Sequence, residues 1–144
     1  MCGCLSLHTL FSMARDLYCD TALVLQEAGQ IDFAGKTAVV IDILRATSTM
    51  TTALANGASA IYPVATVEEA EKLRRDRGCM LGGERGGKKL PGFDLGNSPL
   101  EYTKETVAEK EIVMTTTNGT QAILAAAAAD TVMLASFLNL DAVV

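Results

Sequence analysis

Side chains that can bind an anion beside a divalent metal gather in a few short stretches of this sequence. Magnesium prefers carboxylate oxygens and often completes its coordination with a substrate phosphate. Arginine binds phosphate or sulfonate through a planar fork of donors, and lysine adds a flexible point charge. The charged side chains in these stretches are Asp42, Glu84, Asp94, Arg45, Arg85, Lys88 and Lys89. Together they predict a site for a phosphorylated anion and magnesium, with Asp42, Glu84 and Asp94 as metal ligands.

Hydroxyl and amide side chains stand in the same stretches, several of them beside expected helix starts. Free N–H groups at helix N-termini favour anions, and glycines let the backbone approach a ligand closely. Ordinary surface pairing is the alternative for any one charged residue, but the concentration of polar residues at strand ends favours a site. The predicted substrate-binding residues are Thr47, Ser48, Lys88, Lys89, Asn97, Thr116 and Thr117.

Two kinds of hydrophobic pattern alternate along the chain from residue 37 onward. Short apolar runs predict strands, the first of them a buried parallel strand. Capping signals and glycine stops predict helices, and Thr66 with Glu69 predicts a capping box. The expected strands span residues 38–43, 60–65, 79–81, 111–116 and 131–136, and the expected helices residues 46–56, 67–77 and 121–129.

Strands that alternate with helices indicate a three-layer α/β/α fold with a mainly parallel or mixed sheet. Ligands in such folds bind beyond the carboxyl ends of the strands, where the polar stretches fall. We expect residues 1–34 to form an N-terminal extension and first element, with Met1 or Met13 as the start. We expect residues 35–144 to form an α/β domain that is shortened at its C-terminus, because a helix capped by Asn139 would stop within its first turn.

Residues 83–99 are rich in glycine and proline and carry charges of both signs. We expect a long functional loop without regular structure, which ends in a second capping box formed by Ser98 and Glu101. Residues 82–88 also fit the pattern of a phosphate-binding P-loop. Lys89 stands where that motif needs a magnesium-binding hydroxyl, so we reject the P-loop interpretation.

Two other phosphatase motifs are matched only in part, because the neighbouring residues do not fit their chemistry. The spacing of Cys79 and Arg85 is that of cysteine phosphatases, but Glu84 would raise the pKa of the thiol. We therefore expect Cys79 to be structural. Asp42 lacks the second acid that aspartyl phosphatases carry two residues on. Capping of the following helix by Asp42 stays open as an alternative to metal binding.

Composition excludes several classes of function. With 12 basic and 17 acidic residues the chain has a formal net charge of −5, so we expect no nucleic-acid binding, which needs a basic face. No apolar run reaches the roughly 18 residues that span a bilayer, and the N-terminus lacks the basic start of a secretory signal. We expect a cytoplasmic protein with reduced cysteines. Zinc binding is not expected at a cluster whose spacing fits poorly: Cys2, Cys4, His8 and Cys19.

Long motifs of the chain resemble those of the 2-phosphosulfolactate phosphatase family in order and spacing. They are VVIDILRATSTMTTALANGA, GGERGGKKLPGFDLGNSPLEYT and TTTNGT, and the resemblance covers about residues 35–139. It implies a magnesium-dependent phosphatase that hydrolyses 2-phospho-3-sulfolactate to 3-sulfolactate and phosphate, on a route to coenzyme M. Members of that family are longer at the C-terminus, so the chain is similar to roughly their first two-thirds.

The resemblance and the residue types together lead to a hypothesis of metal-assisted hydrolysis. Asp42 and Glu84 would hold the magnesium, with Asp94 or Asn97 as a further ligand, and the metal would polarise the phosphate and position a water. Asp42 is the expected acceptor of the water's proton. Arginine and amide donors would neutralise charge on the phosphoryl oxygens. The expected catalytic residues are Asp42, Arg45, Arg85 and Asn118.

Two other functions stay open on the sequence alone. A non-catalytic anion-binding fragment is one, because the family's remaining part could carry site residues. A nucleotide-binding protein is the other, although the chain has neither a sound Walker pattern nor a G-x-G-x-x-G motif. The expected binding partner is a small anionic phosphorylated substrate. A homodimer is a further expectation.

Overall fold

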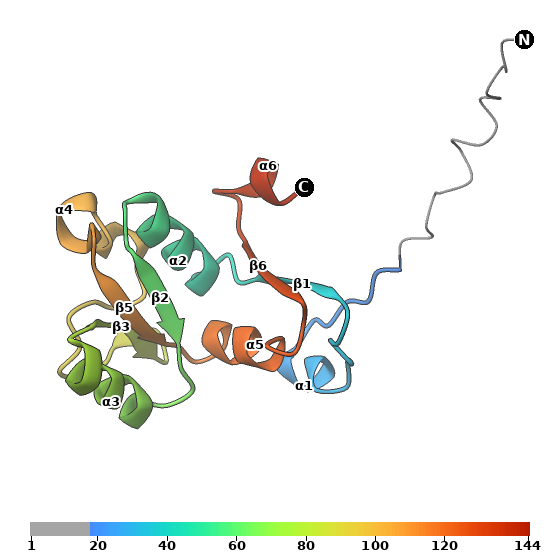
Figure 1. The fold of residues 1–144 in the computed structure, drawn as a ribbon, viewed down its shortest axis with the longest axis horizontal. Coiled ribbons are helices and arrows are strands. Elements are labelled where there is room, and N and C mark those ends of the chain that lie inside the picture. Colours follow the sequence, from blue (N-terminus) through green and yellow to red (C-terminus); the bar gives the residue numbers. More distant parts are fainter. Residues whose placement is uncertain (1–17) are drawn as a thin grey trace, which may run out of the picture.

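The computed structural model describes residues 18–144, and Cys2, Cys4 and His8 lie outside them. The chain has an α/β fold with mainly parallel strand pairing, as predicted (Figure 1). Its strands divide between two separate sheets, a division that the sequence pattern did not indicate. Within residues 18–144 we find no helix that has both the length and the apolar character needed to cross a bilayer.

The larger sheet has the strand order β2–β5–β3–β4 and is parallel except for β4, which pairs antiparallel with β3. Its strands are β2 (Ala60–Pro63), β3 (Met80–Arg85), β4 (Lys88–Lys89) and β5 (Glu111–Thr115). The central strand β5 is apolar on both faces. Val113 packs in one buried cluster with Ala70, whereas Ile112 and Met114 pack in another with Met50. Helices therefore cover both faces of this sheet, as the three-layer prediction requires.

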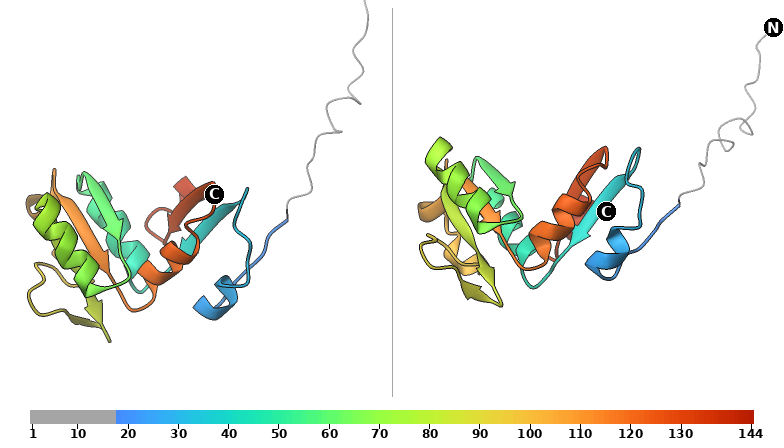
Figure 2. Two further views of the ribbon diagram at one scale, coloured as in Figure 1. Left: turned by 60° about the horizontal axis from the view of Figure 1, so that its bottom comes forward. Right: turned by 90° about the horizontal axis from the view of Figure 1, so that it is seen from below.

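The smaller sheet is a parallel pair of β1 (Thr37–Ile41) and β6 (Thr131–Ala135). Two helices, α2 and α5, contact strands of both sheets and lie between them (Figure 2). The helical elements are α1 (Leu25–Ala28), α2 (Ala46–Ala55), α3 (Val67–Arg77), the 3-10 turn η2 (Pro99–Glu101), α4 (Lys104–Val107), α5 (Gly119–Ala125) and α6 (Leu140–Val143). The predicted capping box of α3 is confirmed, with Thr66 and Glu69 bonded reciprocally.

The prediction of an unstructured loop at residues 83–99 was wrong at its start. β3 continues to Arg85, and a turn of Gly86 and Gly87 leads directly into β4. Both glycines have positive φ, 59° and 79°, as a two-residue hairpin turn needs. We interpreted the glycines as loop signals, whereas Gly83 instead allows β3 to pack closely on the backbone of Thr115.

The predicted capping box at Ser98 was also wrong. The side chain of Ser98 caps nothing, and the short helix that follows is the 3-10 turn η2. The carboxylate of Glu101 instead accepts a hydrogen bond from the N–H of Gly96 at 2.9 Å. Glu101 therefore holds the preceding loop in place, next to Asn97.

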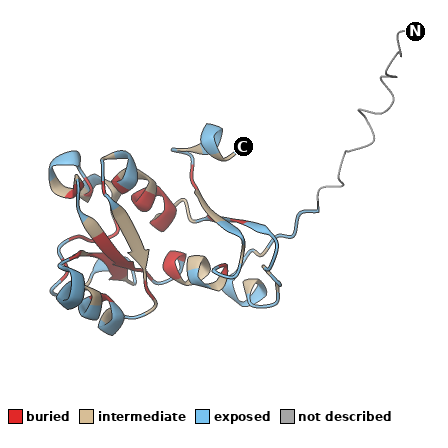
Figure 3. Cartoon of the chain, viewed as in Figure 1, coloured by how far each residue is buried: buried red, intermediate tan, exposed pale blue. Residues whose placement is uncertain are grey.

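The first strand is buried on only one face, whereas the sequence predicted burial on both. Ala38 and Val40 are buried, and Thr37, Val39 and Ile41 are exposed (Figure 3). The apolar run is continuous, but the second face of β1 stays exposed at Val39 and Ile41.

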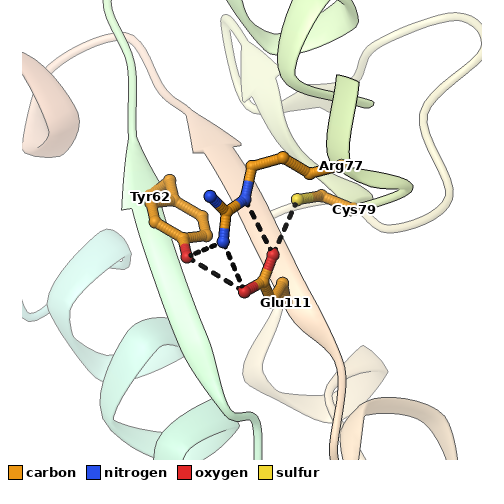
Figure 4. Close-up of polar contacts among 4 residues, drawn as sticks. All are labelled: Tyr62, Arg77, Cys79 and Glu111. Carbon is orange, nitrogen blue, oxygen red and sulfur yellow. Dashed lines mark hydrogen bonds and ion pairs between the residues drawn. The ribbon is translucent and has the colours of Figure 1, made fainter. Parts of the chain in front are cut away.

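A compact polar cluster joins the amino end of β5 to the end of α3 (Figure 4). The guanidinium of Arg77 donates to both carboxylate oxygens of Glu111, at 2.7 and 3.0 Å, and lies over the ring of Tyr62. The thiol of Cys79 donates to the same carboxylate at 3.5 Å, and burial raises the pKa of Cys79. These interactions explain why Cys79 is buried. It lies beside the first residue of β5, at the opposite end of that strand from Thr115.

We expect this cluster to stabilise the fold in a pH-dependent way. Hydrogen bonds from Arg77 lower the pKa of Glu111 from 4.5 to about 2. A carboxyl group whose pKa is depressed on folding stabilises the protein above its unfolded pKa. That stabilisation is lost as the pH falls from about 4.5 towards 2. Glu111→Gln should therefore unfold at a lower urea concentration than wild type at pH 7, by a smaller margin at pH 3.

The matched control is Glu68→Gln, because the exposed Glu68 has no ion pair within residues 18–144. Its urea midpoint should stay close to wild type at both pH values. A Glu111→Gln deficit of the same size at pH 7 and pH 3 would contradict the linkage.

Candidate active site

A polar pocket of about 300 Å³ lies at the carboxyl ends of β1, β3 and β5. This position is the one expected of a ligand site in an α/β fold. The residues that line it are Asp42, Leu44, Arg45, Glu84, Gly86, Gly87, Asn97, Thr117 and Asn118. Segments far apart in the sequence therefore meet here, and most of the polar lining had been predicted.

Asp42 follows β1 and presents a carboxylate that has no hydrogen-bond partner within residues 18–144. Its backbone is held instead. The N–H of Thr47 donates to the Asp42 carbonyl at 3.1 Å, and the Thr47 hydroxyl donates to that carbonyl at 2.8 Å and to the carbonyl of Ala135 at 2.7 Å. The side chain of Asp42 does not cap α2, so the capping alternative is wrong. Its carboxylate is free to bind a ligand.

Arg45 enters the same pocket from the start of α2, after a cis peptide bond between Leu44 and Arg45. Within residues 18–144 its guanidinium makes no ion pair and no hydrogen bond. An arginine fork without a protein acceptor beside a pocket suits phosphate or sulfonate.

Glu84 connects two of the loops that form the pocket. Its side chain is buried, and its carboxylate accepts hydrogen bonds from the N–H groups of Thr117 and Gly87, both at 2.7 Å, and from the Thr117 hydroxyl at 3.1 Å. Burial by itself would raise the pKa of Glu84, but these hydrogen bonds lower it below its ordinary value. The carboxylate stays ionised and fixes both loops in position.

Asn97 supplies a second oxygen donor without a partner. The residue is 6% exposed, and its Oδ1 has no hydrogen-bond partner within residues 18–144. A buried polar atom without a partner is costly, which makes it a sign of a missing ligand. The backbone carbonyl of Asn97 accepts from the hydroxyl of Thr49 at 3.1 Å, which ties the loop to α2.

The oxygen donors of the pocket fit a magnesium ion. Asp42 and Asn97 offer free oxygens, and Glu84 uses three hydrogen bonds of about four acceptor positions on a carboxylate. Magnesium needs few protein ligands because it keeps several waters. Within residues 18–144, no group of three or more His, Cys, Asp or Glu side chains is arranged to hold a metal. Asp94, the third predicted carboxylate ligand, does not line the pocket.

Asp94 and the two lysines are exposed. The carboxylate of Asp94 accepts from Arg74 at 3.1 Å and from the N–H of Leu81 at 2.8 Å. Lys88 and Lys89 are exposed on β4, and the Lys89 ammonium donates to the carbonyl of Asp94 at 3.3 Å. None of these three lines the pocket.

Arg85 is placed apart from the pocket, although it follows Glu84 directly. Its guanidinium donates to the carbonyl of Glu84 and to the hydroxyl of Thr115, both at 2.8 Å, and to the carbonyl of Ala65 at 3.3 Å. Side chains alternate along a strand, so Arg85 points away from the face on which Glu84 lies. It joins the ends of the strands rather than lining the cavity.

Of the predicted hydroxyl ligands, only Thr117 lines the pocket, whereas Thr47, Ser48 and Thr116 do not. The hydroxyl of Ser48 donates to the carbonyl of Ile43 at 2.8 Å. Thr116 and Thr120 bond to each other through backbone and side chain. Like Thr47, these residues position the loops and do not line the pocket, whereas Thr117 does. The sequence did not predict Leu44, Gly86 and Gly87 as pocket-lining residues. The signal that could have revealed the hairpin was the pair of glycines between two short charged runs.

Gly119 lets α5 approach Asp42. A Cβ added at Gly119 would contact the side chain of Ala46 and lie 2.7 Å from Oδ2 of Asp42. Overpacking of this kind typically costs about 1–3 kcal/mol. We expect Gly119→Ala to lower the free energy of unfolding by that amount in urea titrations. Gly29→Ala is the control, because its Cβ meets only the carbonyl of Gln26 at 3.5 Å; equal losses in both variants would contradict the close approach.

Comparison with known proteins identifies a family and several relatives. The family model described as 2-phosphosulpholactate phosphatase matches residues 23–144. A probable 2-phosphosulfolactate phosphatase of Thermotoga petrophila is 59% identical over 109 residues, which cover 76% of this chain and 47% of the relative. A protein of the same name from Thermotoga maritima is 56% identical over 109 residues, with the same coverage. Another, from Caldicellulosiruptor saccharolyticus, is 57% identical over 103 residues, which cover 71% of this chain and 43% of the relative. The chain spans about half the length of the curated relatives it matches.

Proposed function

Because the chain belongs to the 2-phosphosulpholactate phosphatase family, we propose that it carries the phosphate and magnesium site of a phosphatase. The substrate is 2-phospho-3-sulfolactate, and the products are 3-sulfolactate and phosphate. The observation that supports this most is the convergence of a free carboxylate, a free guanidinium and an unpartnered amide oxygen in one pocket: Asp42, Arg45 and Asn97. This combination suits a small anion bound together with a cation.

Arg45 and Asn118 bind the phosphoryl oxygens in this proposal. Both line the pocket, and their N–H donors can approach an oxygen on which negative charge builds during P–O cleavage. Lys88 and Lys89 lie outside the pocket on exposed β4. They raise the local concentration of an anionic substrate through their charge, an effect that salt screens.

Asp42 and Asn97 would hold the magnesium, and Glu84 has an acceptor position left for it. A bound metal would supply Lewis acidity and orient a water. Asp42 accepts the proton of the attacking water through its carboxylate, because both oxygens of Glu84 already accept hydrogen bonds. Glu84 instead keeps the 84–87 turn and the loop at Thr117 in the geometry that places Asn118.

The family and the composition support a proposal for the cellular setting. We place the reaction in the cytoplasm, in coenzyme M or other sulfonate metabolism, with a small phosphorylated molecule as partner. The net charge of −5 argues against nucleic acid as a partner. A homodimer is the proposed assembly.

Release of inorganic phosphate from 2-phospho-3-sulfolactate tests the proposal. We expect release in the presence of Mg²⁺ and none after addition of EDTA. The half-length of the chain relative to its relatives favours one rival, a non-catalytic anion-binding fragment. Saturable calorimetric binding of phosphate without any release would support that rival. If the chain neither binds phosphate nor releases it from the substrate, both the phosphatase and the anion-binding function are contradicted.

A further inference from the structure

One face of the β1–β6 pair carries exposed apolar side chains on β1, although Ala135 beside Ile41 on that face is buried. Val39 and Ile41 are 43% and 65% exposed, while Ala38 and Val40 on the opposite face are buried in a cluster with Ala126 of α5. Residues paired in a parallel ladder point to the same face, and Val39 pairs with Met133. We call the surface formed by Val39, Ile41 and Met133 the open face.

Exposed apolar side chains continue beyond the carboxyl ends of both strands. Leu44 follows β1 and is 87% exposed, and Phe137 follows β6 and is 76% exposed. Single exposed apolar residues are ordinary on protein surfaces. Here several of them follow one another along β1 and in the loops after β1 and β6, and contiguous apolar surface marks an interaction site.

On this face β1 lacks the cover that a parallel sheet requires. Parallel strands occur almost only with helices over both faces, and a two-stranded sheet alone is marginally stable. Each strand of this pair has one neighbouring strand within residues 18–144. The larger sheet of the same chain meets the rule, since α3 packs on one face and α2 on the other.

The relatives carry a polypeptide of sufficient length to provide that cover. The match spans 47% of the Thermotoga maritima relative, so more than half of that protein lies outside it. We propose that the open face binds this additional polypeptide, through an amphipathic helix that places aliphatic side chains on Val39, Ile41 and Met133. The inference is independent of the proposed phosphatase activity.

Binding at the open face would bring the partner to the edge of the candidate active site. Leu44 lines the pocket and is the most exposed apolar residue next to β1. A polypeptide that covers Ile41 and Leu44 would therefore close the pocket on that side and exclude water from it. The docking surface and the site meet at this residue.

Coexpression tests the proposal directly. The tagged chain is produced together with the part of the Thermotoga maritima relative that lies outside the match, and the purified material is analysed by size exclusion. We expect a complex with equal amounts of the two polypeptides. Ile41→Lys should reduce the recovered partner at least tenfold, because it would bury a charge in an apolar contact. Leu100→Lys is the matched control, since Leu100 is 87% exposed on η2, away from the open face, and should leave recovery unchanged.

Thiol labelling provides a second measurement that does not depend on a charged substitution. Ile41→Cys should react at least ten times more slowly with a thiol reagent when the partner is coexpressed, while Leu100→Cys should react equally in both cases. Absence of a complex, or retention of the partner by Ile41→Lys, would overturn the proposal. A dimer of the chain alone that Ile41→Lys dissociates would also overturn it, because a second copy would then cover the open face.

Discussion

Arg45→Ala is expected to lower kcat for phosphate release by a factor of about 100 or more, as does loss of one donor from an electrostatic site. Arg45 lines the pocket, and its guanidinium has no acceptor within residues 18–144. A contact made mainly in the transition state lowers kcat and kcat/KM together, whereas loss of uniform binding raises KM alone. Steady-state kinetics of Arg45→Ala on 2-phospho-3-sulfolactate separate the two cases, and calorimetry with inorganic phosphate measures anion binding without turnover.

Arg85→Ala is the matched comparison, and we expect a different kind of loss. Its guanidinium holds the carbonyl of Glu84 and the hydroxyl of Thr115, so its removal should lower the free energy of unfolding by about 1–3 kcal/mol. Phosphate binding per folded molecule should change little. A variant Arg85→Ala with wild-type stability and a hundredfold lower kcat would reverse these assignments and return Arg85 to the catalytic role that its sequence position had indicated.

The order of strands and helices followed from local patterns, because those patterns are local in origin. The capping box of Thr66 and Glu69 and the left-handed Gly78 at the end of α3 depend on neighbours within a few residues. The division into two sheets could not be predicted in the same way. It depends on which strand pairs with which, and the apolar runs of β1 and β5 look alike. Only their packing differs: β5 is covered on both faces and β1 on one.

The location of the pocket was predictable for a similar reason, since polar residues that follow parallel strands meet at one edge. The roles of the individual side chains were not. Glu84 and Arg85 are adjacent in sequence, yet one lines the pocket and the other binds the ends of β2 and β5, because a strand continues through both. The error came from treating Gly82 and Gly83 as the end of that strand. Likewise, Asp94 was the predicted third carboxylate ligand and Asn97 its alternative, and only Asn97 lines the pocket.

The loss of magnesium binding should be complete in Asp42→Ala and close to complete in Asn97→Leu, while both variants stay folded. The carboxylate of Asp42 and the Oδ1 of Asn97 have no protein partner within residues 18–144, so their removal breaks no hydrogen bond of the fold. Replacing an unpaired buried polar group with an apolar one of similar size can be neutral or stabilising, as can removing a charge from a site. Calorimetric titration with Mg²⁺ measures the binding, and thermal unfolding without Mg²⁺ measures the stability.

Glu84→Gln distinguishes a positioning carboxylate from a ligand in the same experiments. The amide that replaces one oxygen would face the N–H of Thr117 or Gly87, both of which now donate to Glu84 at 2.7 Å. An unsatisfied buried donor costs about 1–3 kcal/mol, so this variant should unfold at lower temperature without Mg²⁺, unlike Asp42→Ala and Asn97→Leu. Magnesium should still raise its unfolding temperature, because binding to the folded state stabilises it by mass action. Stabilisation by Mg²⁺ that persists in Asn97→Leu and disappears in Glu84→Gln would show that the ligand and positioning roles are exchanged.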